Sequence, residues 1–333
     1  MRQRELLDPK GSVAPLGQRT ARPTANGSKP TRVVAARGNL WQRLKDLWRC
    51  RELFVFLVRK EIKIKYKNSF LGFLWSMLNP ALTLAVFYVL FTFFLPNGIP
   101  NFVIYMFSAM LVWNLFQTAV LGATASVVAN AGIVKKVAFP REILAISSVG
   151  AAFMFLLFQS VVILVFMFAF WHRPDWGLIW LLPVALAAIV AFAAALSVFL
   201  SAVNVYLRDT QHLVEVVLMA WFWAVPGIYA FSGRVHDGLV RHTLFGIPGT
   251  HLIWLYFANP VAPVVMSFQR FFYNVVHPVS TVTHKVIAGG VMARYTPSWY
   301  LASDLIVLGV SLVLFLGAMI VFGRLEGNFA EEL

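Results

Sequence analysis

The chain has 333 residues, of which 59% are hydrophobic and 13% are charged, whereas ordinary globular domains are roughly 45–50% apolar and about 25% charged. This balance excludes the two soluble domains that the length alone would permit, and it predicts one all-α integral membrane domain. The net charge is +14, and residues 1–71 hold 17 of the Lys and Arg residues against 5 Asp and Glu. Positive charge beside a membrane span marks the cytoplasmic side and binds anionic lipid headgroups. We therefore expect this segment to bind membrane lipids and not nucleic acid.

Residues 1–38 are predicted to form a disordered basic extension. They are rich in Arg, Pro, Gly, Ser and Thr and have no apolar period. A signal peptide needs an apolar segment after its basic start, and none follows before Leu71, so no cleaved leader is expected. Cys50 is the only cysteine of the chain, which excludes an intrachain disulfide and a cysteine-based metal cluster.

Residues 39–68 are predicted to form an amphipathic interface helix, because apolar and aromatic residues recur at helical spacing between basic ones. Ile62, Ile64 and Tyr66 also alternate with lysines, as they would in a strand. Helix is preferred because Asn68 and Ser69 supply a break and a cap before the first span. The side chains expected to anchor this helix at the membrane surface are Trp41, Trp48, Lys60, Lys63 and Lys67.

Residues 69–333 are predicted to form a domain of six transmembrane helices, each close to the 20 apolar residues that a span requires. The bases are concentrated before the first span and between the second and third. Both termini are therefore expected in the cytoplasm of a multi-pass plasma (inner) membrane protein. Glu215 and Asp304 are expected at the interface, since they lie near span ends. The predicted spans are 71–95, 102–129, 143–170, 178–205, 213–231 and 299–322.

The segment from His251 to Met266 is apolar but has only about 16 residues, which is too short to cross a membrane. Asn259 and Pro260 interrupt it near the middle, since Pro removes a donor and disfavours helix in the residue before it. We expect a re-entrant pair of extracellular half-helices that serve as a gate. A helix lying on the membrane surface is the alternative.

The sequence contains no nucleotide-binding or zinc-binding motif, so no catalytic residue and no metal site are predicted. Ionisable residues are almost absent from the spans, which argues against a proton-driven pump. Aromatic side chains in or near the spans could form a wall for sugar rings, or could pack against lipid. The channel candidates are Tyr88, Tyr105, Trp113 and Phe116, and Asn114 and Gln117 are expected to form hydrogen bonds between helices.

The loop between the second and third spans has apolar residues at helical spacing flanked by bases, and Phe139-Pro140 ends it. A short helix that docks into a soluble partner would have this pattern. A plain positive-inside loop is the alternative. The residues assigned to this docking function are Val134, Lys135, Lys136, Val137, Phe139, Pro140, Arg141 and Glu142.

Three motifs resemble the permease, or transmembrane, subunit of type-2 ABC exporters of polysaccharides, which export O-antigen, capsule, teichoic acid and galactan. They are 66–75 (YKNSFLGFLW), 134–142 (VKKVAFPRE) and 204–210 (NVYLRDT), and the likeness continues through 258–260 and the tail 322–333. The resemblance implies six spans, an interface helix, a coupling helix between spans two and three, and re-entrant gate helices. The first 38 residues and a long last extracellular loop at 275–297 depart from the pattern.

The resemblance also implies a function. The chain would be a transport subunit and not an enzyme, and would work as a homodimer with two copies of an ABC ATPase. The chain itself would hold no cofactor, because ATP and Mg²⁺ would bind the partner ATPase. The substrate would be a lipid-linked glycan of unspecified structure. A drug or lipid exporter of the same architecture is the alternative within transport. A membrane-embedded glycosyltransferase or acyltransferase, or a membrane anchor, is the alternative outside it.

Overall fold

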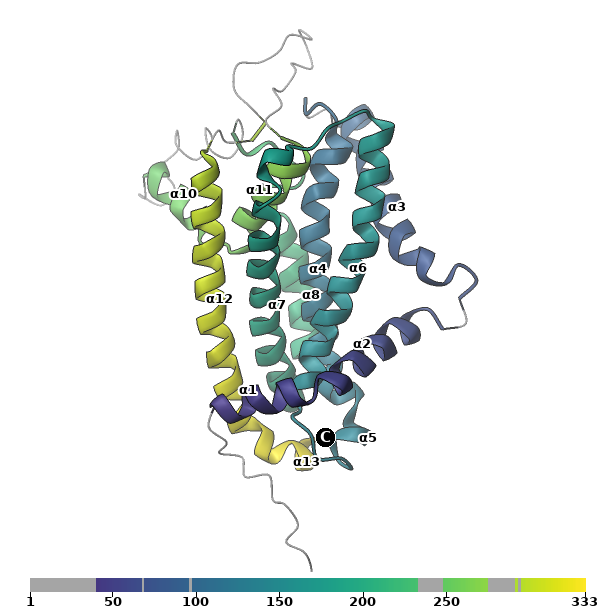
Figure 1. The fold of residues 1–333 in the computed structure, drawn as a ribbon, viewed down its shortest axis with the longest axis vertical. Helices are drawn as coiled ribbons and strands as arrows, with labels where there is room; N and C mark the ends of the chain where they lie inside the picture. Colours follow the sequence, from purple (N-terminus) through teal and green to yellow (C-terminus); the bar gives the residue numbers. More distant parts are fainter. Residues whose placement is uncertain (1–39, 68, 96–97, 233–247, 275–290, 293–294) are drawn as a thin grey trace, which may run out of the picture. The chain divides into compact units, whose positions relative to one another are not determined.

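The computed structural model describes residues 40–67, 69–95, 98–232, 248–274, 291–292 and 295–333, and every regular element in these ranges is a helix (Figure 1). The chain divides into two compact units, 1–35 and 36–333, and all described residues belong to the second. The all-α prediction is confirmed for this part of the chain. The predicted disordered extension and most of the long loop 275–297 lie outside the described residues.

Two helices occupy the predicted interface segment. They are α1 (Leu40–Arg49) and α2 (Arg51–Lys65), and the chain is divided at Cys50, whose ψ of 18° is not helical. One continuous helix was expected here. Trp41 and Trp48 are exposed on α1, so the aromatic face that the sequence pattern predicts is open. We call the end of the bundle with α1, α2, α5 (Ala131–Val134) and α13 (Phe329–Glu332) the α1 end (Figure 1).

In the part of the chain that the structure describes, five helices are long and apolar enough to cross a membrane. The first is α3 (Trp75–Val89), which continues through the π-helical turn Leu90–Phe94, and the last is α12 (Pro297–Leu325), which continues through Glu326–Asn328. Between them lie α4 (Phe102–Ala129), α6 (Glu142–Ala169) and α7 (Leu181–Tyr206). The predicted fifth span, 213–231, contains only the 13-residue α8 (Thr210–Phe222). The structure therefore supports a multi-pass chain, and the count of six spans stays a prediction.

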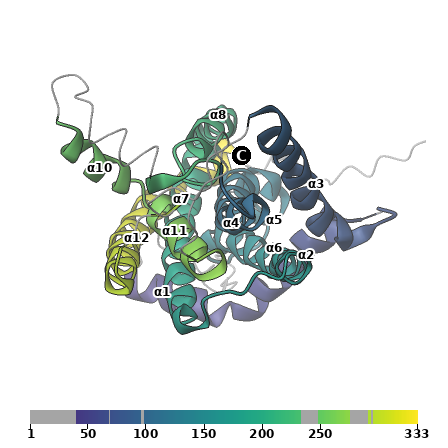
Figure 2. The ribbon, with the colours of Figure 1, turned by 90° about the horizontal axis from the view of Figure 1, so that it is seen from above.

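Helix α4 lies at the centre of the bundle, surrounded by α3, α6, α7, α8 and α11 (Val261–Phe272) (Figure 2). In its most apolar window 83% of the residues are buried, against 11% in α3 and 28% in α12. A helix that is hydrophobic on all sides must be covered all round, by protein or by lipid. Protein covers α4, whereas α3 and α12 present most of their surface outward, and α12 packs mainly along α7.

The segment around Asn259 forms two helices, α10 (Gly249–Phe257) and α11 (Val261–Phe272), separated at the predicted break. Helix α11 enters the bundle and packs against α4 and α7, while α10 lies at its edge (Figure 2). The Ser267 hydroxyl donates a hydrogen bond to Asp304 Oδ2 at 2.7 Å. Asp304 on α12 is therefore buried against α11, and its expected position near the membrane interface stays a prediction.

Helix α2 packs closely on α6 at Gly150. A Cβ atom at this position would lie 2.7 Å from Phe54 Cζ and 2.8 Å from Val58 Cγ2. Glycine therefore lets the interface segment approach the bundle, and the contact fixes where α2 lies.

Gly150→Val is expected to lower the free energy of unfolding by about 1–3 kcal/mol more than Gly309→Val, because only the first overpacks a contact. Gly309 is the matched control, since it is also helical and has no atom within 4 Å of a built Cβ. Thermal unfolding of the purified variants in detergent measures the difference. Equal melting temperatures would show that α2 does not pack on α6 in this way.

Candidate functional site

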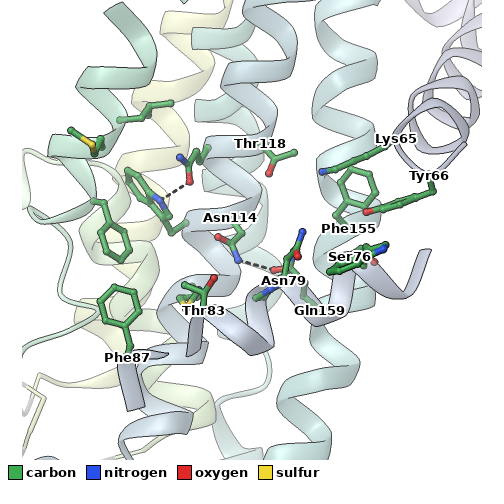
Figure 3. Close-up of a pocket in the computed structure, with 18 of the residues that line it drawn as sticks. Lys65, Tyr66, Ser76, Asn79, Thr83, Phe87, Asn114, Thr118, Phe155 and Gln159 are labelled. Carbon is green, nitrogen blue, oxygen red and sulfur yellow. Dashed lines mark hydrogen bonds between the residues drawn. The ribbon is translucent and has the colours of Figure 1, made fainter. Parts of the chain in front are cut away.

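A polar groove of about 480 Å³ lies between the end of α2 and the helices α3, α4, α6 and α8 (Figure 3). Its wall combines aromatic rings with amide and hydroxyl groups. Nine polar side chains thus gather on one wall in a bundle whose long helices are mainly apolar. The polar residues of the wall are Lys65, Tyr66, Ser76, Asn79, Thr83, Asn114, Gln117, Thr118 and Gln159.

Two hydrogen bonds organise the amides of the groove. Asn114 Nδ2 donates to Gln159 Oε1 at 3.0 Å, which joins α4 to α6. Gln117 Oε1 accepts from Trp113 Nε1 at 3.1 Å within α4. Asn79 on α3 points toward the Asn114–Gln159 pair (Figure 3). Asn114 thus forms the bond between helices that the sequence predicts, whereas Gln117 bonds within its own helix.

The four aromatic side chains predicted to line a channel lie in three different environments. Trp113 lines the groove. Tyr105 and Phe116 are fully buried in the core instead, where Tyr105 donates to the Tyr229 carbonyl at 2.8 Å and Phe116 stacks on Phe192. Tyr88 is partly exposed on α3 outside the groove wall. Tyr105 and Phe116 are buried because α4 is central, so its rings fill spaces between helices.

Lys65 is the one charged residue among the described residues that line the groove. Its ammonium lies 4.3 Å from the centroid of the Phe155 ring, and loss of hydration beside these apolar neighbours lowers its pKa. The Tyr66 ring packs edge-on against the same phenylalanine. Lys65 was not among the predicted site residues, although its place in the basic run 59–67, just before the first span, was a usable signal.

The loop 130–141 presents two faces. Val134 is 2% exposed and Glu142 is buried, so these two candidates point into the protein. Lys135 and Lys136 are exposed, and Val137 is 55% exposed. Phe139, Pro140 and Arg141 are partly buried. The helix itself is limited to the four residues of α5, which is shorter than the piece predicted from the spacing of Val134, Val137 and Ala138.

Both interface helices contact this loop. Lys60 Nζ on α2 donates to Asn130 Oδ1 at 2.5 Å, at the point where α4 ends. Arg43 on α1 pairs with Glu142 and with Glu326. Lys63 and Lys67 are exposed, as expected of side chains that meet headgroups. Arg43 and Glu326 were not identified from the sequence, because a spacing of 283 residues gives no local signal.

Asn259 holds the short connection between α10 and α11 in place. Its Oδ1 accepts hydrogen bonds from Trp221 Nε1 at 2.9 Å and from the Val261 amide at 3.1 Å, and its Nδ2 donates to the Ala224 carbonyl at 3.1 Å. Pro260 then precedes the first residue of α11. The Asn-Pro pair thus holds the start of α11 against the end of α8.

The structure has the features of a membrane transport subunit. They are apolar helices of spanning length, the two amphipathic helices α1 and α2 at one end, and a polar groove in the bundle. The family of ABC-2 type transporters matches residues 52–234, more than half of the chain, and the chain belongs to this family. It is 34% identical over 231 residues to the O-antigen export system permease protein RfbA of Myxococcus xanthus, which covers 69% of this chain and 84% of that protein. Two RfbA proteins of Klebsiella pneumoniae are 28% and 29% identical, each over 67% of this chain and 81% of their own length.

These relationships confirm the resemblance inferred from the motifs. They also confirm that the chain is a transport subunit and not an enzyme. The family match ends at residue 234, so α10, α11 and α12 lie outside it.

Asn259→Ala is expected to lower the free energy of unfolding by about 2 kcal/mol, because it removes three hydrogen bonds of roughly 1 kcal/mol each, partly replaced by water. Asn328→Ala is the control, since Asn328 is exposed. Thermal unfolding of both variants in detergent gives the comparison. If the two variants melted together, Asn259 would not be holding α11 to α8.

Proposed function

We propose that this chain is the transmembrane subunit of an ATP-driven exporter that moves a lipid-linked polysaccharide from the cytosolic side across the inner membrane. The observation that carries the proposal is the polar groove in a mainly apolar bundle. The relatives named as O-antigen export permeases support it.

The chemistry of the groove suits a glycan. Sugar hydroxyls donate and accept hydrogen bonds, and amides such as Asn79, Asn114 and Gln159 do both. The apolar faces of sugar rings pack on aromatic side chains such as Trp113. Lys65 at one end of the groove could pair with an anionic group of the lipid-linked substrate. A drug or lipid exporter of the same architecture is less well supported, because an apolar cargo would make no hydrogen bonds with the amide groups that remain after Asn114 bonds to Gln159.

A second copy of the chain is expected to cover the groove. Lipid offers no hydrogen bonds, so polar side chains in a bundle must face protein or water. The groove lies between α3 and α8, and both helices expose apolar side chains beside it. A two-fold pair would bring two grooves together as the walls of one channel. The position of the groove thus supports the proposed homodimer.

Energy is expected from two copies of a separate ABC ATPase, and the family implies such a partner. ATP and Mg²⁺ would bind that partner. The outward face of the loop, Lys135, Lys136 and Val137, is the docking surface that we propose for it. Closure of the ATPases would push this loop and the interface helices and would part the spans.

The proposed topology has six spans and both termini in the cytoplasm. Helix α8 is about 20 Å long at 1.5 Å per residue, which is shorter than the roughly 30 Å of the hydrocarbon core. The fifth crossing therefore needs the continuation 223–231, in which 223–230 are not helical. The packing of α11 against α4 supports a re-entrant segment, because non-helical backbone at the Asn259–Pro260 break is tolerated at membrane depth when protein buries it.

Changing Lys136 and Val137 together to Asp is expected to abolish export while membrane insertion stays normal, because both side chains are exposed on the outward face of the loop. Two carboxylates would replace a basic and an apolar contact with the ATPase and would be left without partners in that interface. Export is measured by surface glycan in cells, and docking by co-purification of the ATPase. Normal export and co-purification by the double variant would exclude this loop as the docking surface.

Trp113→Ala is expected to reduce export by about fivefold to thirtyfold, which corresponds to the loss of roughly 1–2 kcal/mol of stacking with sugar rings. Trp180→Ala is the control for loss of an exposed indole, because Trp180 lies at the start of α7 and donates to the Gly177 carbonyl. Trp113 is only 4% exposed and packs on Phe116 and Phe222, so thermal unfolding of both variants in detergent must first show that Trp113→Ala stays folded. ATPase co-purification should be normal in both variants. Equal export by the two variants would contradict a glycan path along this groove.

A further inference from the structure

The guanidinium of Arg43 joins three segments at the α1 end. Its Nη1 donates to Glu142 Oε1, and its Nη2 donates to Glu326 Oε2 at 3.0 Å. Arg43 belongs to α1, Glu142 directly follows the loop 130–141, and Glu326 follows α12. We call the side chains of Arg43, Glu142 and Glu326 the Arg43 bridge.

The bridge is shielded from water. The side chains of Arg43 and Glu326 are each 14% exposed, and that of Glu142 is 2% exposed. Two carboxylates in such a place repel one another unless a cation lies between them. The planar guanidinium can donate to both at once from fixed directions, whereas a lysine ammonium would hold them as a point charge. Arginine therefore fixes the relative positions of the three segments.

The C-terminal segment 324–333 is itself built into this end. Arg141 Nη1 donates to the Glu326 carbonyl at 2.9 Å, and Tyr206 donates to the Leu325 carbonyl at 2.7 Å. Phe329 is fully buried against Phe322 and Tyr206. The segment is thus fastened to the loop, to α7 and to α12, and it is not a free tail.

The backbone leaves room for the bridge at Gly323. A Cβ atom there would lie 2.6 Å from Arg43 Cζ and 2.8 Å from both terminal nitrogens. The guanidinium therefore passes directly over the α12 backbone, which brings Glu142 and Glu326 within reach of one side chain. The close approach of Arg43 explains why residue 323, in the last turns of α12, is a glycine.

We propose that Arg43 is a positioning residue of the transport cycle, which makes α1, the loop 130–141 and the C-terminal segment move as one body. The proposal rests on the proposed function, because the push is delivered by the ATPase at the loop. Displacement of the loop displaces Glu142, and the bridge passes the motion to α1 and to the end of α12. Apolar contacts at this end allow sliding, whereas charge-assisted bonds in fixed directions resist it.

The test is the triple variant Arg43→Met, Glu142→Gln and Glu326→Gln in the complete transporter with its ATPase. Arg43→Met alone leaves two buried carboxylates unpaired and could simply unfold this end. The triple variant removes every charge of the bridge, so its melting temperature should stay within about 3 °C of the wild type. Its ATP hydrolysis should be retained within about twofold, while glycan exported per ATP falls by about tenfold, a size typical of coupling between sites.

Arg49→Met is the matched control, because Arg49 lies on the same helix and pairs only with exposed Asp46 at 3.4 Å. Its export per ATP should equal that of the wild type. Arg43→Lys should give an intermediate ratio. Unchanged export per ATP in the triple variant would overturn the proposal, as would loss of ATPase co-purification, since the bridge would then serve docking. Absence of glycan export by the wild-type complex would instead refute the proposed function.

Discussion

Polar groups in a membrane need partners that lipid does not provide, and this constraint shapes most of the bundle. It explains why Asn114 on α4 is hydrogen-bonded to Gln159 on α6. It also explains why Asn259, between helices α10 and α11, forms hydrogen bonds through both the oxygen and the nitrogen of its amide. Among the described residues, buried oxygens of Asn204, Asp304 and Ser311 have no partner, and the groove presents further amides and hydroxyls of α3, α4 and α6 on one surface. A second copy and a hydrated glycan would supply partners in the groove.

The α1 end satisfies a related constraint by a different means. Charged side chains are partly withdrawn from water there, and they are paired through Arg43, Arg141 and Lys60 with groups on three other segments. The exposed part of the loop, Lys135 to Ala138, lies beside these pairs. A force applied to the loop therefore meets a network of directional bonds, while the groove that would carry the substrate lies among helices held mainly by apolar packing.

The sequence predicts where helices begin and end better than it predicts which residues they contact. Apolar length predicts the long helices, and the Asn259–Pro260 pair predicts the break before α11, since both signals are local. The sequence could not show that Tyr105 and Phe116 are buried in the core, because α4 is apolar on every side and shows no face. The end of helix α8 at Phe222 was not evident either, because the apolar run continues to Phe231. Arg43 and Glu326 meet only through tertiary structure, and no periodicity relates them.

Disulfide cross-linking between copies tests most directly the claim that two grooves face one another. In a Cys50→Ser background, single cysteines would replace Val86 on α3, Met219 on α8 and Val313 on α12, which are 67%, 65% and 69% exposed. The account predicts that mixed membranes carrying the Val86 and Met219 variants give a cross-linked dimer under mild oxidation, and that Val313 variants do not. Dimers formed only through Val313, or through none of the three, would contradict a channel built from two facing grooves.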